Sequence, residues 1–275
     1  MARHRILPAG SQRTARSPWA WAGAGALLGL VITVISQAPA TWLSAAVDRA
    51  TAGRMVLAEA RGTVWTGSAR LLLSGGSGSS DQSALPGRVD WQVRPMWQGL
   101  SVQLGADCCI RNPAGLRLLP RWGGARLQLL DDTASPARPS VWPAALLGGL
   151  GAPWNTLQVE GQLSLLTQGF SVEWVEGRMS MAGKAELIAA GMSSRLSTLK
   201  PMGSYRITLD AGTADMLKLA TIEGSLQLAG TGRWVGSRLR FEGVATATPG
   251  REAALSNLLN IIGRRNGARS IITVG

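Results

Sequence analysis

One uncharged stretch near the N-terminus constrains this 275-residue chain more than any other feature. No charged side chain occurs from Ser17 to Val47, and residues 19–35 form the apolar run WAWAGAGALLGLVITVI. A helix over residues 19–40 would be about 30 Å long, which matches the hydrocarbon thickness of a bilayer. The sequence therefore predicts one transmembrane helix over residues 19–40. No second run of this kind follows, which excludes a polytopic transporter.

The flanking residues predict an orientation. The basic tail, residues 1–18, holds four arginines, and no acidic residue precedes Asp48. Arginines beside one end of a span mark the cytoplasmic side. We therefore expect a cytoplasmic tail and a periplasmic domain over residues 41–275. The residues that predict this topology are Arg3, Arg5, Arg13 and Arg16.

Aromatic and small residues mark the predicted membrane anchor. Indole rings favour the headgroup level of a bilayer, and tryptophans occur at both ends of the apolar run. A small-xxx-small pair within the run could pack against another membrane helix, although glycine is also common in spans. The predicted anchor residues are Trp19, Trp21, Gly25, Gly29 and Trp42.

A cleaved signal peptide is the alternative to a retained anchor. The tripeptide Ala38-Pro39-Ala40 has the small-x-small form of a cleavage site. The apolar run is longer than the usual signal-peptide core, which favours retention. Both alternatives export the rest of the chain.

Composition argues against catalysis and against nucleic-acid binding. His4 is the only histidine and lies in the basic tail, and the chain has two cysteines. We therefore predict no catalytic residue, no cofactor and no metal site, and we do not expect an enzyme. The net charge is +12, but outside the tail the basic residues are scattered, so nucleic acid is not an expected partner.

Alternating apolar and polar residues predict a mainly β periplasmic domain. Between residues 54 and 247 about eleven such segments recur, separated by glycine or proline, and residues 269–274 predict a last strand. Short connections favour a curved antiparallel sheet, either a meander or a partial barrel. Two short helices are expected over residues 142–150 and 251–262, and another over residues 41–52. A sub-division of the domain is possible near residues 131–139.

Two residue types in this domain need a separate interpretation. Cys108 and Cys109 are adjacent, so a vicinal disulfide, an intermolecular bond and two free thiols are all open. We favour an internal disulfide with a structural role.

The tryptophans fall mostly inside strand patterns, which predicts core positions, although some could line an apolar groove. They are Trp65, Trp91, Trp97, Trp122, Trp142, Trp154, Trp174 and Trp234.

Several segments, taken in order, resemble the protein N family of the bacterial type II secretion system. They include GTVWTGSARL from Gly62, LPGRVDWQVRP from Leu85, PMGSYRITLD from Pro201, GTGRWVGSRLRFEGVATATP from Gly230 and LSNLLNIIGRRNG from Leu255. Together with Pro39-Ala40-Thr41-Trp42-Leu43 they cover nearly the whole chain. The cysteine pair has no place in this pattern.

The resemblance implies a single-span inner-membrane protein with a periplasmic domain, an accessory part of the machinery that moves folded proteins across the outer membrane. It brings no catalytic residues. The implied partners are other type II secretion subunits of the inner-membrane platform, or the secretin. The alternative is a periplasmic lipid-binding or lipid-conducting groove protein of AsmA-like type, with lipid as a possible ligand.

Overall fold

A computed structural model describes residues 19–76, 78–130, 140–213, 216–235 and 238–275. The chain forms two compact units, residues 1–38 and residues 39–275, and the second is called the body below. The four topology arginines and the possible sub-division at residues 131–139 lie outside the described residues.

The first unit contains helix α1, Trp19–Ser36. The predicted continuous helix over residues 19–40 is wrong in its C-terminal part, because the helix stops at Ser36 and a new one begins at Ala40. Pro39 precedes that new helix with extended backbone angles, and proline cannot donate the hydrogen bond that would continue α1. No described helix combines the length and the apolar character needed to cross a membrane.

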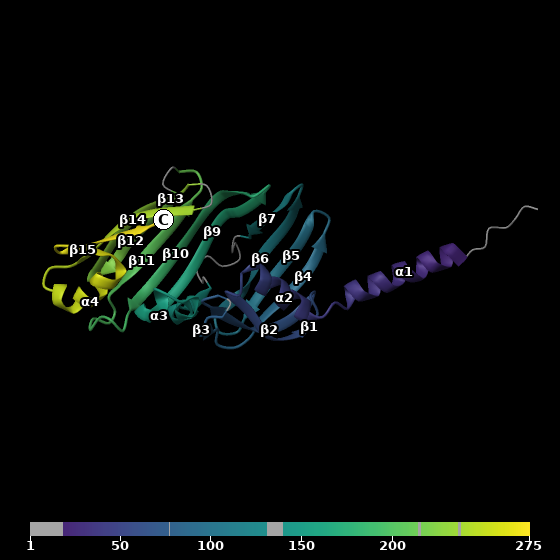
Figure 1. The fold of residues 1–275 in the computed structure, drawn as a ribbon, viewed down its shortest axis with the longest axis horizontal. Helices are drawn as coiled ribbons and strands as arrows, with labels where there is room; N and C mark the ends of the chain where they lie inside the picture. Colours follow the sequence, from purple (N-terminus) through teal and green to yellow (C-terminus); the bar gives the residue numbers. More distant parts are fainter. Residues whose placement is uncertain (1–18, 77, 131–139, 214–215, 236–237) are drawn as a thin grey trace, which may run out of the picture. The chain divides into compact units, whose positions relative to one another are not determined.

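The body is built on one antiparallel sheet, in which the described residues form sixteen strands (Figure 1). Its first half contains β1 Met55–Gly62, β2 Thr66–Ser74, β3 Gln82–Ala84, β4 Val89–Met96, β5 Gly99–Ala106, β6 Ile110–Arg121, β7 Gly124–Leu129 and β8 Val141–Pro143. The second half contains β9 Glu160–Val175, β10 Arg178–Ser193, β11 Gly203–Asp210, β12 Leu217–Gly224, β13 Leu226–Val235, β14 Arg238–Ala247, β15 Arg264–Asn266 and β16 Arg269–Val274. The predicted mainly β, antiparallel fold is confirmed.

Neighbours in the sheet are almost always neighbours in the chain. The order is β1-β2-β4-β5-β6-β7-β9-β10-β11-β12-β13-β14-β16-β15, and the short strands β3 and β8 pair with β2 and β9. The sheet is therefore a meander whose two end strands are β1 and β15. Every second connection lies at the same end of the strands, so the hairpin turns fall into two rows.

The longer strands, of which β4 is an example, present one apolar face and one polar face. In β4, Val89 and Trp91 are buried whereas Asp90 is exposed. Trp91 pairs with Leu104 of β5, and Gln92 pairs with Gln103, so the two faces continue from strand to strand. This alternation is what a sheet with one face packed and one face solvated requires.

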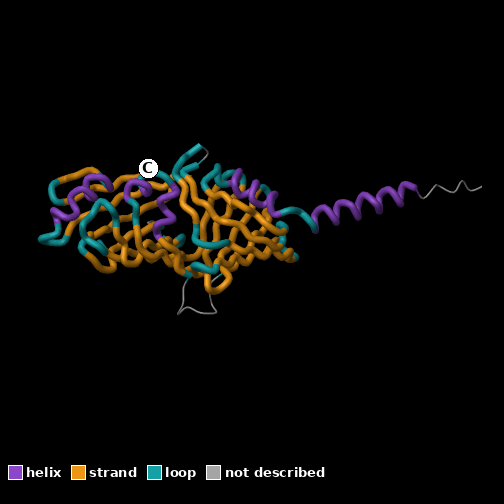
Figure 2. Tube along the Cα trace, turned by 90° about the horizontal axis from the view of Figure 1, so that it is seen from below, coloured by secondary structure: helices purple, strands orange, loops and turns teal. Residues whose placement is uncertain are grey.

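The helices of the body pack on the apolar face (Figure 2). They are α2 Ala40–Ala50, the 3₁₀ helix η1 Ala144–Leu150, α3 Trp154–Leu157 and α4 Glu252–Ile262. In α4, the buried leucines Leu255, Leu258 and Leu259 join a core with Tyr205 of β11 and Ala245 of β14. This arrangement follows from the apolar stripe that the sequence of α4 carries.

The predicted helices differ in detail from the observed ones. The segment predicted over residues 251–262 is α4, and that over residues 41–52 is α2. The segment predicted over residues 142–150 becomes β8 followed by η1, because Pro143 lies between them in extended conformation. Helix α3 and the strands β3, β6, β8 and β15 have no counterpart in the prediction.

Candidate functional site

The two end strands of the sheet are the first candidates for contact with another chain. Over the described residues, β1 pairs only with β2, and β15 pairs only with β16. The regular part of β1, from Met55 to Ala58, pairs with Leu73 to Arg70. A strand with one unpaired side offers backbone donors and acceptors to an incoming strand.

The two ends are not equally suited to pairing. β15 has three residues, all exposed, and begins with Arg264 and Arg265, and a short charged strand discourages pairing. β1 has eight residues and a bulge between Ala58 and Arg61, with Glu59 in the left-handed region at φ 51°. The bulge shortens the regular edge of β1 without removing it, so Met55–Ala58 is the better pairing site.

Several acidic side chains of the sheet form ion pairs across strands. Glu173 of β9 lies 2.6 Å from Nη2 of Arg126 and 3.8 Å from Nε of Arg121. Asp210 of β11 lies 2.9 Å from Nζ of Lys184. These pairs stabilise neighbouring strands and engage both carboxylates with cations.

Two titratable groups have shifted pKa values, and both shifts have structural causes. The pKa of Asp210 lies below its ordinary value, because the carboxylate accepts hydrogen bonds from Lys184 and from the backbone N–H of Gly212. Burial raises the pKa of the Tyr205 hydroxyl, which donates a hydrogen bond to the carbonyl oxygen of Leu226 at 3.2 Å. Tyr205 therefore stays protonated and serves the core.

Two surface hollows of moderate size are formed by described residues of the body. One, about 520 Å³, lies over β1, β2, β4 and β5 and is lined by Arg61, Asp90 and Gln103 among others. The second, about 430 Å³, includes Asp81 and Glu160. Asp81 accepts a hydrogen bond from Asn155, and Glu160 pairs with Lys200, so neither carboxylate is directed at the other. Within the described ranges, no group of three His, Cys, Asp or Glu side chains is placed to hold a metal ion.

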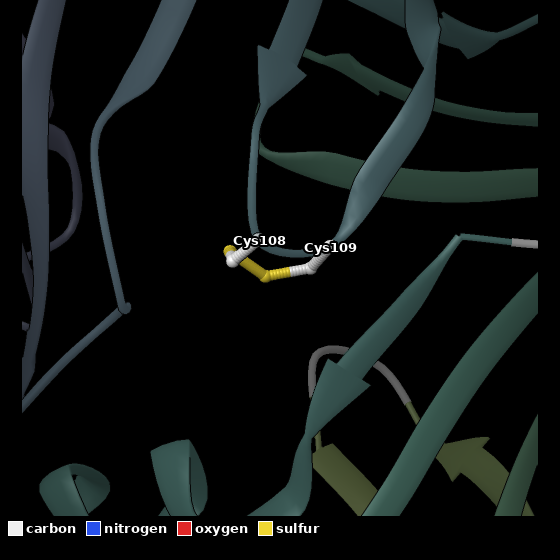
Figure 3. Close-up of a disulfide and its surroundings, with 2 residues drawn as sticks. All are labelled: Cys108 and Cys109. Carbon is white, nitrogen blue, oxygen red and sulfur yellow. A yellow bond between two sulfur atoms is a disulfide. The ribbon is translucent and has the colours of Figure 1, made fainter.

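The cysteine pair lies in the turn between β5 and β6 (Figure 3). The sulfur atoms of Cys108 and Cys109 are bonded to each other. Cys108 is exposed, whereas Cys109 is buried in a small core with Leu85, Val89 and Ala106. The carbonyl oxygen of Cys109 accepts a hydrogen bond from the backbone N–H of Val141 at 3.0 Å. This hydrogen bond ties the turn to β8.

The predicted anchor residues are dispersed and exposed. Trp19 and Trp21 lie in the first turn of α1, and no atom comes within 4 Å of a Cβ built at Gly25 or Gly29. Trp42 lies in the first turn of α2, in the body. Four of these residues thus lie in the first unit and one lies in the body.

The expected core position is right for Trp91. It is wrong for the exposed tryptophans, which are Trp97, Trp122, Trp154 and Trp174. Trp91 is 4% exposed and donates from Nε1 to the carbonyl oxygens of Thr63 and Val64, both at 3.2 Å. Trp97 and Trp122 are 101% and 98% exposed. Each occupies a hairpin turn, where the strand pattern no longer decides burial.

Comparison with known proteins decides the family. The family model of the type II secretion system (T2SS), protein N, matches residues 53–272, which include every strand of the sheet except the last two residues of β16. The chain belongs to the type II secretion system protein N family. The resemblance inferred from the sequence is therefore confirmed. A search of curated proteins and a search of solved structures each return no match.

Membership of the protein N family makes this chain a component of type II secretion. The matched region begins at Gly53, just before β1, and so covers the sheet and not α1. The family is a part of a secretion machine, and the ion pairs and hollows described above add no catalytic arrangement to it.

Proposed function

We propose that this protein N family member is an accessory, non-catalytic subunit of the type II secretion machinery that connects other subunits through its sheet. The observation that carries the proposal is the family match over residues 53–272, the region that forms the open meander. The partners are subunits of the inner-membrane platform or the secretin. A deletion strain should release less exoprotein while export into the periplasm continues.

The contact mode that the sheet favours is strand addition at β1. Four regular residues, Met55–Ala58, have a strand partner on one side only among the described residues, and an added strand would satisfy the other side. A photo-crosslinking residue at Met55, which is partly exposed, should capture a secretion subunit in an intact secreting strain. The same residue at Glu242, exposed in β14, which has a strand partner on both sides, is the matched control. Equal capture at both positions would argue against strand addition.

We also propose that the N-terminal unit attaches the protein to the bacterial inner membrane. Support comes from the uncharged run over residues 19–35 and from the exposed apolar side chains of α1, among them Leu27, Leu28 and Ile32. The protein should then stay with the membrane during carbonate extraction. Its release by carbonate, or a mature N-terminus within residues 38–41, would favour the cleaved signal peptide instead.

The orientation is part of the same proposal. The arginines of residues 1–18 support a cytoplasmic tail, which leaves the body in the periplasm. A reporter fused after Gly275 should be active only in the periplasm, and cytoplasmic activity would contradict this. The AsmA-like lipid groove gains no support from the family match.

A further inference from the structure

The two fully exposed tryptophans lie in one row of turns. Trp97 is in the β4–β5 turn, residues 97–98, and Trp122 is in the β6–β7 turn, residues 122–123. The row also contains the β1–β2 turn, residues 63–65, and the β9–β10 turn, residues 176–177. We call this row the tryptophan edge. In Figure 1, β4, β5, β6 and β7 run side by side toward it.

Backbone contacts hold these turns together. A Cβ at Gly99, beside Trp97, would be 2.1 Å from the carbonyl oxygen of Leu118, so the β4–β5 turn packs directly against β6. The backbone N–H of Glu176 donates to the carbonyl oxygen of Gly123, beside Trp122, at 3.1 Å. The β4–β5 and β6–β7 turns that carry the two indoles are therefore linked by backbone contacts, about two strand spacings apart in the sheet.

Other tryptophans and the first residue of the body lie at the same edge. Pro39 forms a bridge with Thr63 in the β1–β2 turn, so the chain joins the body here. Trp42 follows in the first turn of α2 and is 56% exposed. Trp174 lies next to the last residue of β9 and is 45% exposed. At the opposite row of turns the structure places Trp142 and Trp154.

The charge at this edge is positive. Arg94 near the end of β4 and Arg178 at the start of β10 are exposed, and neither takes part in the ion pairs found among the described residues. Glu173 is neutralised by Arg126 and Arg121. Among the described residues in or beside the four turns named above, Glu176 is the acidic residue without an ion pair. Exposed arginines without an acidic partner attract phosphate groups.

We propose that the tryptophan edge docks on the surface of an anionic phospholipid bilayer. Indoles have an apolar body and one N–H donor, a combination that favours the headgroup level of a bilayer. Trp97 and Trp122 would enter this layer while Arg94 and Arg178 pair with lipid phosphates. The ends of the strands would then face the membrane, and β1 would remain at the side of the sheet. The proposal therefore does not depend on whether β1 receives a partner strand.

A label beside Trp97 tests the proposal in the full chain. Gln98 is exposed in the β4–β5 turn, and Gln98→Cys can carry an environment-sensitive fluorophore because the native cysteines are bonded to each other. Detergent is removed from one sample of the labelled protein in the presence of phosphatidylglycerol vesicles. In a second sample, without vesicles, an amphipathic polymer replaces the detergent. With vesicles the label should shift its emission to the blue and lose most of its quenching by iodide. The same label on Glu252→Cys, in α4 at the opposite row, should remain accessible to iodide.

Matched variants assign the effect to the named side chains. Trp97→Ala combined with Trp122→Ala should restore iodide quenching at position 98, whereas Trp154→Ala at the opposite row should not. Arg94→Gln combined with Arg178→Gln should restore it in phosphatidylglycerol, as should high salt. A label at position 98 that stays accessible to iodide with vesicles would overturn the proposal and favour a protein partner for the indoles. Equal protection at positions 98 and 252 would also overturn it.

Discussion

The leucine stripe of α4 gives a sharp prediction about what closes the C-terminal part of the sheet. Leu259 is 0% exposed and lies in the core with Leu255 and Tyr205, and Ser270 Oγ donates to its carbonyl oxygen at 2.6 Å. Leu259→Ala keeps that hydrogen bond and removes only the buried hydrocarbon. Burial of the lost carbons contributes roughly 2 kcal/mol, and the cavity adds to this. Because partly buried Leu228 can shift into the space, we expect a loss of about 3 kcal/mol.

Ile261 is the matched control, since it lies in the same helix and is 46% exposed. Ile261→Ala should cost about 1 kcal/mol or less, because half of its surface is already in water. Urea unfolding followed by far-ultraviolet circular dichroism gives the free energy of unfolding of both variants in mild detergent. Hydrogen exchange in β14 and β16 tests whether the loss is local. Equal losses for Leu259→Ala and Ile261→Ala would refute the assignment of α4 as a core helix.

Three further predictions concern single contacts. Gly230→Ala should destabilise the sheet by about 1–3 kcal/mol in the same urea assay, because the new Cβ would be 2.4 Å from Cζ of Phe241. Asp210→Asn should lower the thermal midpoint at neutral pH but not at acidic pH. The lowered pKa of Asp210 means that its pairing with Lys184 is fully present above the ordinary carboxyl pKa and is lost as the pH falls through the folded pKa. Thiol reduction should raise the intact mass by two hydrogens in the wild type and not in Cys108→Ser.

Strand periodicity was enough to predict β4 and β5. In β4 the alternation of Val89 and Trp91 with Asp90 identifies both the strand and its buried face. β6 was missed because its sequence, IRNPAGLRLLPR, contains two prolines and no regular alternation. Its pairing with β5 and β7, not its own residue preferences, makes it a strand.

One predicted strand is two strands in the structure, because the glycine within it was not recognised as the site of a turn. Residues 216–229 were predicted as one strand but divide into β12 and β13 at Gly224 and Ser225. Gly224 has φ 123°, and a Cβ there would be 2.2 Å from Cα of Gly203. The close approach of two backbones depends on the neighbouring strand β11, so the sequence of residues 216–229 alone does not reveal it.

The tryptophan edge was missed because the tryptophans were assigned core positions as a group, from the strand patterns in which most of them fall. The chain reverses at Trp97, so its side chain projects beyond the sheet. The glycines that follow, Gly99 and Gly123, are the signal that could have located both turns.

The meander has a consequence for how the body is made. Apart from β15 and β16, each long strand pairs with the long strand synthesised just before it, and most closing loops are short. The connection from β7 to β9 is longer and contains β8, η1 and α3. A polypeptide that emerges from the ribosome with its N-terminal end first can therefore pair each new strand with the preceding one, without waiting for distant segments. At the C-terminal end β14 departs from this order, because it pairs with β16 only after α4 and β15 have been synthesised. The C-terminal hairpin of β15 and β16 is thus the last part of the sheet to pair, if the sheet forms in the order of translation.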